Sequence, residues 1–147
     1  MKLAALRIPL VVALVCLGVY TYLRSAPILS VSKASPPPMS PQAAALHFVQ
    51  STVASNKVVV WSKSYCPYCR KAKQAMASLL QPDQYLVIEI EERPDMADLQ
   101  DAFKELTGGS SVPRVFVGGK FLGGGDDTAR MAENGELKQL LQAEGVL

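Results

Sequence analysis

The chain has 147 residues, of which 49% are hydrophobic, and its formal net charge at neutral pH is +2. Residues 1–40 hold four basic residues and no acid, a net charge of +4, whereas residues 41–147 hold eleven basic and thirteen acidic residues, a net charge of −2. Neither part is basic enough to indicate nucleic-acid binding, and three cysteines are too few for a disulfide scaffold in a chain of this size. The length allows one globular domain beside a leader segment.

The first predicted element is an uncharged apolar run of 16 residues, 8–23, with basic residues on both sides. Its length lies between that of a signal-peptide core and that of a full membrane span. No cleavage site with small residues is evident beside the run, so we predict that residues 1–24 are an uncleaved signal anchor. A cleaved signal peptide is the alternative, and a transit peptide for an organelle is a third, against which the apolar run argues.

The charges beside this run favour an N-terminus in the cytoplasm, since positive charge is in slight excess before the run. The rest of the chain would then lie in the lumen of the secretory pathway, attached to the membrane through residues 8–23. Secretion after cleavage and delivery to an organelle are the alternative destinations. Residues 25–40 are rich in proline and serine, which predicts a linker that is partly extended.

The globular domain is predicted to span residues 41–147 and to begin with a helix. Leu46, Val49 and Val53 would share the buried face of this helix. The β-branched run at residues 58–62 that follows is typical of a short strand buried within a sheet.

The remaining patterns predict a helix through residue 80, a strand over 85–91, a helix over 95–107, a hairpin, and a last helix in two pieces. Gly118 and Gly119 lie between two apolar runs, as the turn of a two-residue hairpin requires. This order predicts an α/β fold in which helices flank a four-stranded mixed sheet.

The sequence Cys66-Pro67-Tyr68-Cys69 lies where the first strand gives way to the next helix. The first turn of a helix carries unpaired N–H groups and the positive end of the helix dipole, which favour the thiolate form of a cysteine. Pro67 suits the first helical position. We therefore predict that Cys66 is an exposed nucleophile and that Cys69 attacks the mixed disulfides formed on it, with positive charge added by nearby Lys63, Arg70 and Lys71.

Two other interpretations of this motif remain. The same spacing is half of a zinc site, but the other candidate ligands are Cys16, within the apolar run, and His47. A structural disulfide is the second. Because the motif contains a proline and opens a helix within a βαβ pattern, redox chemistry is the preferred interpretation, and we expect no metal site.

Two later segments carry weaker signals. Pro113 directly precedes a predicted strand and is a candidate for a cis peptide bond. Three glycines followed by Asp126 and Asp127 open the last helix. The backbone N–H groups and carboxylates there could bind a ligand that carries both a carboxylate and an ammonium group, or either acid could simply cap the helix.

Together these residues resemble the glutaredoxin family, in its dithiol class with a Cys-Pro-Tyr-Cys site. The resemblance covers about residues 42–147 and implies a thioredoxin-like fold with glutathione as co-substrate. The matching pieces are Lys63-Ser-Tyr-Cys-Pro-Tyr-Cys69, Leu99-Gln100, Thr107-Gly108, Val112-Pro113, Gly118-Gly119-Lys120, Gly123-Gly124, Asp126-Asp127-Thr128 and Asn134-Gly135.

The resemblance also implies a role for each residue that would bind glutathione. The glycine carboxylate of glutathione would be held by Lys63 and Gln100, and Tyr68 would line the groove. The cysteinyl part would pair with the backbone of Val112 before a cis Pro113. The γ-glutamyl end would be received by the backbone of Gly125 and the carboxylate of Asp126.

The sequence departs from the family pattern in two places. Many relatives have Gln-Arg-Thr where this chain has Gly109-Ser110-Ser111, so one positive partner for glutathione is missing. Gly125 stands where the family often has Cys, Ser or Asn, a change that a backbone contact tolerates.

These features predict a glutathione-dependent thiol–disulfide oxidoreductase that reduces glutathione mixed disulfides and protein disulfides. Its expected partners are glutathione, glutathionylated or disulfide-containing proteins and a membrane, but not nucleic acid. A general disulfide reductase or oxidase, like thioredoxin or a lumenal isomerase, is the nearest alternative. An iron–sulfur carrier, with Cys66 from two chains and two glutathiones holding the cluster, and a membrane-tethered redox sensor with little turnover are two others.

Overall fold

The computed structural model describes residues 38–147. The predicted anchor at residues 1–24 and most of the predicted linker at residues 25–40 therefore lie outside the described residues. Between residues 38 and 147, no helix is both long enough and apolar enough to span a bilayer.

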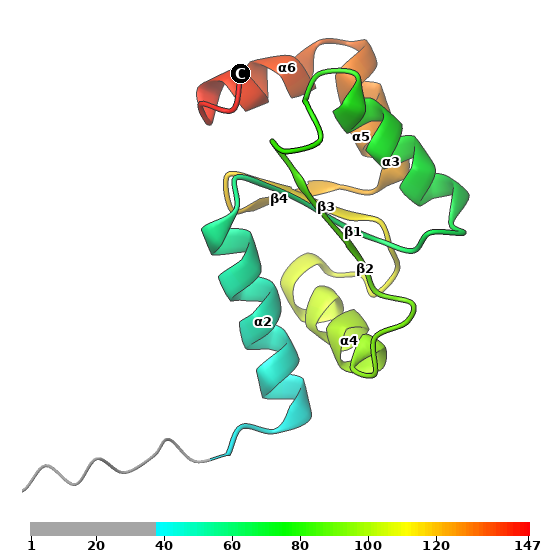
Figure 1. Cartoon of the computed structure of the whole chain (residues 1–147), viewed down its shortest axis with the longest axis vertical. Helices are drawn as coiled ribbons and strands as arrows, with labels where there is room; N and C mark the ends of the chain where they lie inside the picture. The colour runs from blue at the N-terminus through cyan, green and yellow to red at the C-terminus, as the bar shows by residue number, and fades with distance from the viewer. Residues whose placement is uncertain (1–37) are drawn as a thin grey trace, which may run out of the picture. The chain divides into compact units, whose positions relative to one another are not determined.

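The described residues form helices and strands in the order that the sequence predicts (Figure 1). They are α2 (Pro41–Ser55), β1 (Val58–Ser62), α3 (Pro67–Ala77), β2 (Leu86–Glu89), α4 (Met96–Thr107), β3 (Arg114–Val117), β4 (Lys120–Gly123), α5 (Gly125–Glu133) and α6 (Glu136–Ala143).

The strand β2 is shorter than the predicted strand over residues 85–91. The N–H of Ile90 still donates to the carbonyl of Ser62 at 2.9 Å, but the chain then turns so that the Glu91 side chain reaches the backbone of Ser64. Because this turn depends on a contact with a distant segment, the alternation of side chains along the sequence does not predict where β2 ends.

The four strands form one mixed sheet in the order β2-β1-β3-β4. The strand β1 pairs in parallel with β2 and antiparallel with β3, and β3 pairs antiparallel with β4. All five residues of β1 are buried, as expected for a central strand. The predicted α/β fold, a thioredoxin-like four-stranded mixed sheet flanked by helices, is confirmed.

Helices cover both faces of the sheet, α2 and α4 on one side and α3, α5 and α6 on the other (Figure 1). Successive side chains of a strand point to opposite faces. Val59 and Trp61 accordingly lie in the core under α2 and α4, and Val58 and Val60 lie in the core under α3 and α6. The central strand is thus held from both sides up to the residue where the loop to Cys66 begins.

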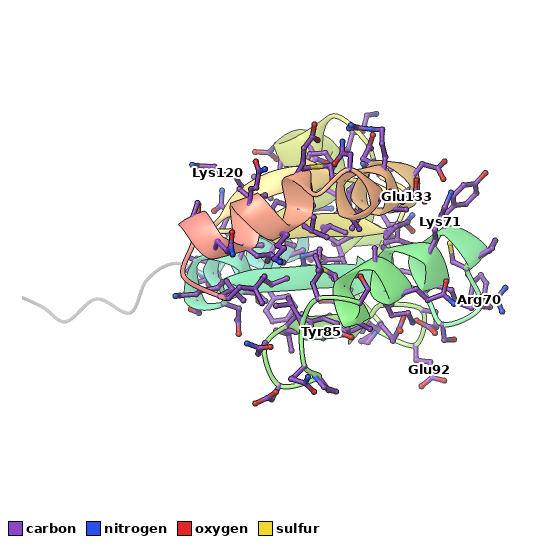
Figure 2. The ribbon with its side chains drawn as sticks, turned by 90° about the horizontal axis from the view of Figure 1, so that it is seen from above. Arg70, Lys71, Tyr85, Glu92, Lys120 and Glu133 are labelled. Atoms are coloured by element: carbon purple, nitrogen blue, oxygen red, sulfur yellow. The ribbon has the colours of Figure 1, made fainter. Side chains whose placement is uncertain are left out.

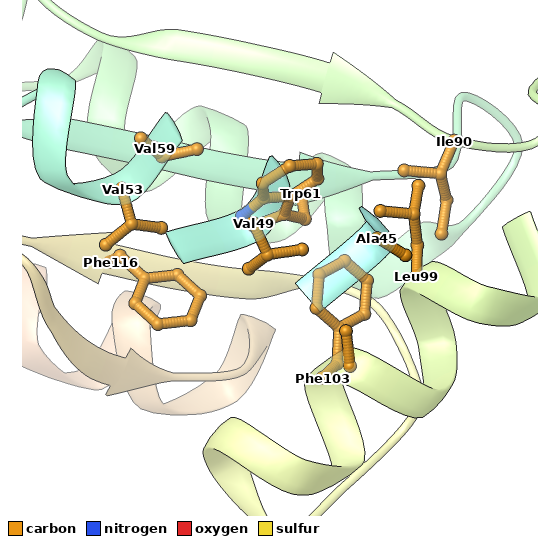
Figure 3. Close-up of a cluster of buried hydrophobic side chains, with 10 residues drawn as sticks. Ala45, Val49, Val53, Val59, Trp61, Ile90, Leu99, Phe103 and Phe116 are labelled. Carbon is orange, nitrogen blue, oxygen red and sulfur yellow. The ribbon is translucent and has the colours of Figure 1, made fainter. Parts of the chain in front are cut away.

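Trp61 is the largest side chain of the core beside α2 and α4, and it is fully buried (Figure 3). Its ring meets Phe48 of α2 edge-on with the centroids 5.7 Å apart, and it meets Phe103 of α4 at a tilt with 5.3 Å between centroids. Such aromatic pairs add to the stabilisation from burial alone. They connect the end of β1 to both helices on this face.

Glycines end one helix and form the hairpin turn, as the sequence predicts. Gly108 has a left-handed conformation with φ of 77° and closes α4, and Gly118 and Gly119, with φ of 56° and 80°, form the turn between β3 and β4. Residues 109–113 then bring the chain from α4 to the start of β3.

Candidate functional site

The two cysteines of the motif lie at the N-terminus of α3. Cys66 caps the helix and Pro67 is its first residue, so the strand-to-helix position predicted for the motif is confirmed. Cys66 is partly exposed, whereas Cys69, one turn further along, is fully buried, and both are free thiols. The two sulfur atoms, one helical turn apart, therefore differ in their access to solvent.

The environments of the two thiols shift their pKa values in opposite directions. Partial burial works against ionisation of Cys66, but hydrogen bonds from the backbone N–H and thiol of Cys69 and from the backbone of Tyr68, with the charge of Lys63, lower its pKa overall. Burial raises the pKa of Cys69 to about 11. At neutral pH Cys66 is therefore the better nucleophile of the pair.

A tight turn over residues 63–66 connects β1 to α3. The N–H of Lys63 donates to the sulfur of Cys69 at 3.4 Å, and the N–H of Cys66 donates to the carbonyl of Lys63 at 3.1 Å. The turn therefore places Lys63 close enough to Cys66 for its charge to favour the thiolate.

The backbone before β3 comes next to the nucleophile. The thiol of Cys66 donates to the carbonyl oxygen of Val112 at a sulfur–oxygen distance of 3.9 Å. The Val112-Pro113 peptide bond is cis, the isomer for which the sequence made Pro113 a candidate. Two segments that are 46 residues apart in the chain thus meet at Cys66.

The N-terminus of α5 lies against the first turn of α3. Gly125 is buried, and a Cβ atom added to it would overlap the carbonyl oxygen of Tyr68, so the two backbones approach as closely as only glycine allows. Tyr68 itself directs its side chain to solvent with 55% of its surface exposed.

The two acids that open α5 have different roles. The Asp127 carboxylate accepts from the N–H of Gly124 at 3.1 Å and so caps the helix. Asp126 instead pairs with Lys71 of α3 at 2.6 Å, and its side chain is 65% exposed. The sequence left open which acid was the cap.

The basic side chains near the motif have different partners. Lys63 contributes to the lowered pKa of Cys66, whereas Lys71 pairs with Asp126. Arg70 and Lys71 project at the exposed edge of α3 (Figure 2).

Gln100 of α4 contacts the segment between α4 and β3. Its amide nitrogen donates to the carbonyl of Ser110 at 3.1 Å, which leaves a second N–H available for another acceptor. Gln100 is thus tied to the segment that leads to Val112 and not to Cys66 itself.

Sequence reasoning missed Glu91, which bonds to the turn that carries Lys63 and Cys66. A signal was available. Glu91 follows β2, and the carboxyl ends of neighbouring parallel strands meet at one edge of a sheet, so it had to lie near the end of β1.

Comparisons with known proteins agree with this geometry. Residues 58–122 match the family model described as Glutaredoxin. The chain is 45% identical over 115 residues to glutaredoxin-C4 of Arabidopsis thaliana, a match that covers 78% of this chain and 82% of that protein.

Two solved structures are also similar. The crystal structure of oxidised glutaredoxin 2 from Chlamydomonas reinhardtii is 56% identical, with a TM-score of 0.71, and the match covers 72% of this chain and 98% of that one. A buckwheat glutaredoxin–glutathione complex is 35% identical, with a TM-score of 0.68, and the match covers 76% of this chain and 99% of that one.

Proposed function

The chain belongs to the glutaredoxin family, as a glutathione-dependent thiol–disulfide oxidoreductase, and we propose that Cys66 is the nucleophile with which it reduces glutathione mixed disulfides and protein disulfides. The observation that carries this proposal is the position of Cys66. It caps α3, is partly exposed and lies beside the Val112 carbonyl, while Cys69 is buried behind it.

The proposed reaction with a mixed disulfide uses one cysteine. The Cys66 thiolate attacks the glutathione sulfur, a Cys66–glutathione disulfide forms, and the target protein leaves as a thiolate that takes up a proton. A second glutathione, as thiolate, then attacks the glutathione held on Cys66. Oxidised glutathione is released and Cys66 returns as a thiolate. Each step breaks one S–S bond and forms another, so the net reaction converts the mixed disulfide and one glutathione thiol into the target thiol and oxidised glutathione.

A protein disulfide would require both cysteines. Cys66 attacks one sulfur of the target, and Cys69 then attacks the resulting mixed disulfide, which releases the reduced target and leaves a Cys66–Cys69 disulfide for two glutathiones to reduce. The hydrogen bond to Cys66 and the charge on Cys66 help to raise the pKa of Cys69. Once Cys66 has entered a disulfide that charge is lost, so Cys69 ionises more readily when it is needed.

Three parts of the site would receive glutathione. Lys63 and the free N–H of Gln100 would bind the glycine carboxylate, and the backbone of Val112 before Pro113 would pair with the cysteinyl part. Tyr68 would line the groove, and Gly125 and Asp126 would hold the γ-glutamyl end. In support, Val112, Tyr68 and the start of α5 all border the first turn of α3.

Transfer of glutathione from a glutathionylated peptide, measured with Cys66→Ser and Cys69→Ser variants, tests the proposal. We expect Cys66→Ser to abolish transfer and Cys69→Ser to keep much of it, since a second glutathione can complete the one-cysteine route. Cys16→Ser is the matched control and should leave transfer unchanged. Equal loss in the Cys66 and Cys69 variants would contradict the assignment.

We also propose that residues 8–23 attach the domain to a membrane of the secretory pathway, with the domain on the lumenal side. The support comes from the apolar, uncharged composition of this run and from the charges beside it. Protease treatment of intact microsomes should leave the domain undigested until detergent is added. Digestion without detergent, or release of the domain by alkaline carbonate, would contradict this proposal.

A further inference from the structure

The turn over residues 63–66 carries both Lys63 and the nucleophile, so its conformation decides how they face each other. Two of its backbone N–H groups find partners within the same region of the chain: that of Lys63 on the sulfur of Cys69, and that of Cys66 on the carbonyl of Lys63. Both bonds lie between residues 63 and 69, so neither connects the backbone of the turn to a distant segment of the chain.

The N–H of Ser64 makes that connection. It donates to the Glu91 carboxylate at 2.8 Å, between residues 27 positions apart in the sequence. Glu91 is itself well fixed, because the N–H of the preceding residue, Ile90, donates to the carbonyl of Ser62 at 2.9 Å and the Ile90 side chain is fully buried. The end of β2 therefore holds the turn that follows β1.

The Glu91 carboxylate is well suited to this task. Hydrogen bonds from Ser64, through its hydroxyl and its backbone, hold the pKa of Glu91 below its usual range, and the charge of Lys73 on α3 acts in the same direction. Glu91 is therefore ionised at neutral pH, and a bond to a charged acceptor is stronger than one between neutral groups. Within residues 38–147 its second oxygen is buried without a hydrogen-bond partner, so the bond to Ser64 is the contact that holds the carboxylate.

We propose that Glu91 is a positioning residue, which holds the turn over residues 63–66 so that Lys63 and the first turn of α3 stabilise the Cys66 thiolate. This inference depends on the proposed role of Cys66 as the nucleophile. Glu91 acts through its hydrogen bonds to Ser64 and takes no part in bond making or breaking.

The direction of the effect on Cys66 separates this role from a simple charge effect. A negative charge near a thiol disfavours the thiolate, so removing a carboxylate that acted only through its charge would lower the pKa of Cys66. Removing a carboxylate that holds Lys63 and α3 in place would raise it.

The experiment measures the rate of Cys66 alkylation by iodoacetamide against pH in the full chain, with the modified peptide identified by mass spectrometry. We expect Glu91→Ala to raise the pH at which the alkylation rate reaches half its maximum, the midpoint, by about half a pH unit or more. Glu91→Gln should give a smaller rise, because the amide oxygen can still accept from Ser64 without carrying charge. Glu92→Gln removes a charge from the exposed neighbouring position, where the side chain projects outward (Figure 2), and should leave the midpoint unchanged.

A second variant tests the bond without altering Glu91. The hydrogen bond from the N–H of Cys66 to the carbonyl of Lys63 closes a four-residue turn. Ser64 is the second residue of this turn, a position that suits proline. Ser64→Pro removes both the N–H and the hydroxyl that donate to Glu91, and it should raise the midpoint as Glu91→Ala does. Combining the two changes should then add little, because both remove the same interaction.

Three results would overturn the inference: a midpoint that falls in Glu91→Ala, a midpoint that stays unchanged in both single variants, or full additivity in the double variant. If Glu91→Ala does not fold, the Ser64→Pro variant alone decides. An unchanged midpoint together with normal glutathione transfer would refute only the role of Glu91. Failure of transfer in the unmodified chain would instead refute the proposed function.

Discussion

At the scale of single residues, the division of labour between the two cysteines follows from burial and hydrogen bonding. Cys66 caps α3 and receives hydrogen bonds from the first turn, whereas Cys69 lies in the core with a pKa raised to about 11. One thiol is accessible and ionised more easily, and the other is held protonated until the first has reacted. The sequence predicts these roles from the motif alone.

The lowered pKa of Cys66 predicts a pH profile. Because the thiolate is the reactive form, the alkylation rate should fall as the pH drops through the lowered pKa, with a midpoint below that of an unperturbed cysteine thiol. Lys63→Met removes a favourable charge and should move the midpoint upward. Lys57→Met, which removes a lysine that donates to the carbonyl of Gly145, is the control and should not move it. A midpoint in the unmodified chain at or above that of an unperturbed cysteine thiol would contradict the account.

At the scale of secondary-structure elements, the site depends on how closely α5 approaches α3. Gly125 permits this approach, and any side chain there would meet the carbonyl of Tyr68. We expect Gly125→Ala to lower the free energy of unfolding by about 1–3 kcal/mol, since forcing a group into a well-packed contact displaces the backbone. Chemical denaturation measures this change.

The neighbouring glycine provides the control for that prediction. A Cβ atom at Gly124 would lie 3.9 Å from the carbonyl oxygen of Pro113, an ordinary contact, and φ there is −91°. Gly124→Ala should therefore change the free energy of unfolding by less than about 0.5 kcal/mol. Equal losses in the two variants would show that the contact with Tyr68 is not the cause.

The ion pair between α3 and α5 predicts an effect on glutathione binding. Lys71 occupies the carboxylate of Asp126, on which the ammonium of the γ-glutamyl group would bind. Lys71→Met should free that carboxylate and lower KM for a glutathionylated peptide by about twofold to fivefold, as expected for an exposed pair. Arg70→Met, one position earlier, is the charge-matched control. A higher KM in Lys71→Met would mean that Lys71 binds the substrate instead of competing with it.

The elements were predictable from local patterns, whereas the contacts between them were not. Proline at the start of α3, glycine at the end of α4 and paired glycines in the hairpin are local signals, and the structure contains all three. The division of roles between Asp126 and Asp127, and the bond from Ser64 to Glu91, depend on how the helices and strands pack. The apolar run at residues 8–23 remains a prediction, as it lies outside the described residues.

At the scale of the whole molecule, the sheet separates two cores and the site lies at one edge of the sheet. The loop after β1, the first turn of α3, the segment before β3 and the start of α5 meet at that edge. The helix α6 closes the core under α3 and carries no residue of the candidate site. A substitution in α6 should therefore change the stability of the fold without changing the reactivity of Cys66.

Leu141 of α6 tests this separation because its side chain is fully buried. Leu141→Ala should lower the free energy of unfolding by about 2–5 kcal/mol through lost burial and the cavity that remains. The midpoint of Cys66 alkylation should stay unchanged at temperatures where the variant is folded. Gln142→Ala, at the exposed next position, should affect neither quantity, whereas a shifted midpoint in Leu141→Ala would show that α6 also shapes the site.

The most direct test of the central claim is to trap the covalent intermediate. The Cys69→Ser variant, which cannot resolve a mixed disulfide, is mixed with a glutathionylated peptide in the absence of free glutathione, quenched with acid and mapped by mass spectrometry. The account predicts a single glutathionyl group on Cys66 and release of the peptide as a free thiol. Attachment of the peptide instead of glutathione to Cys66, or no modification of Cys66 at all, would contradict it.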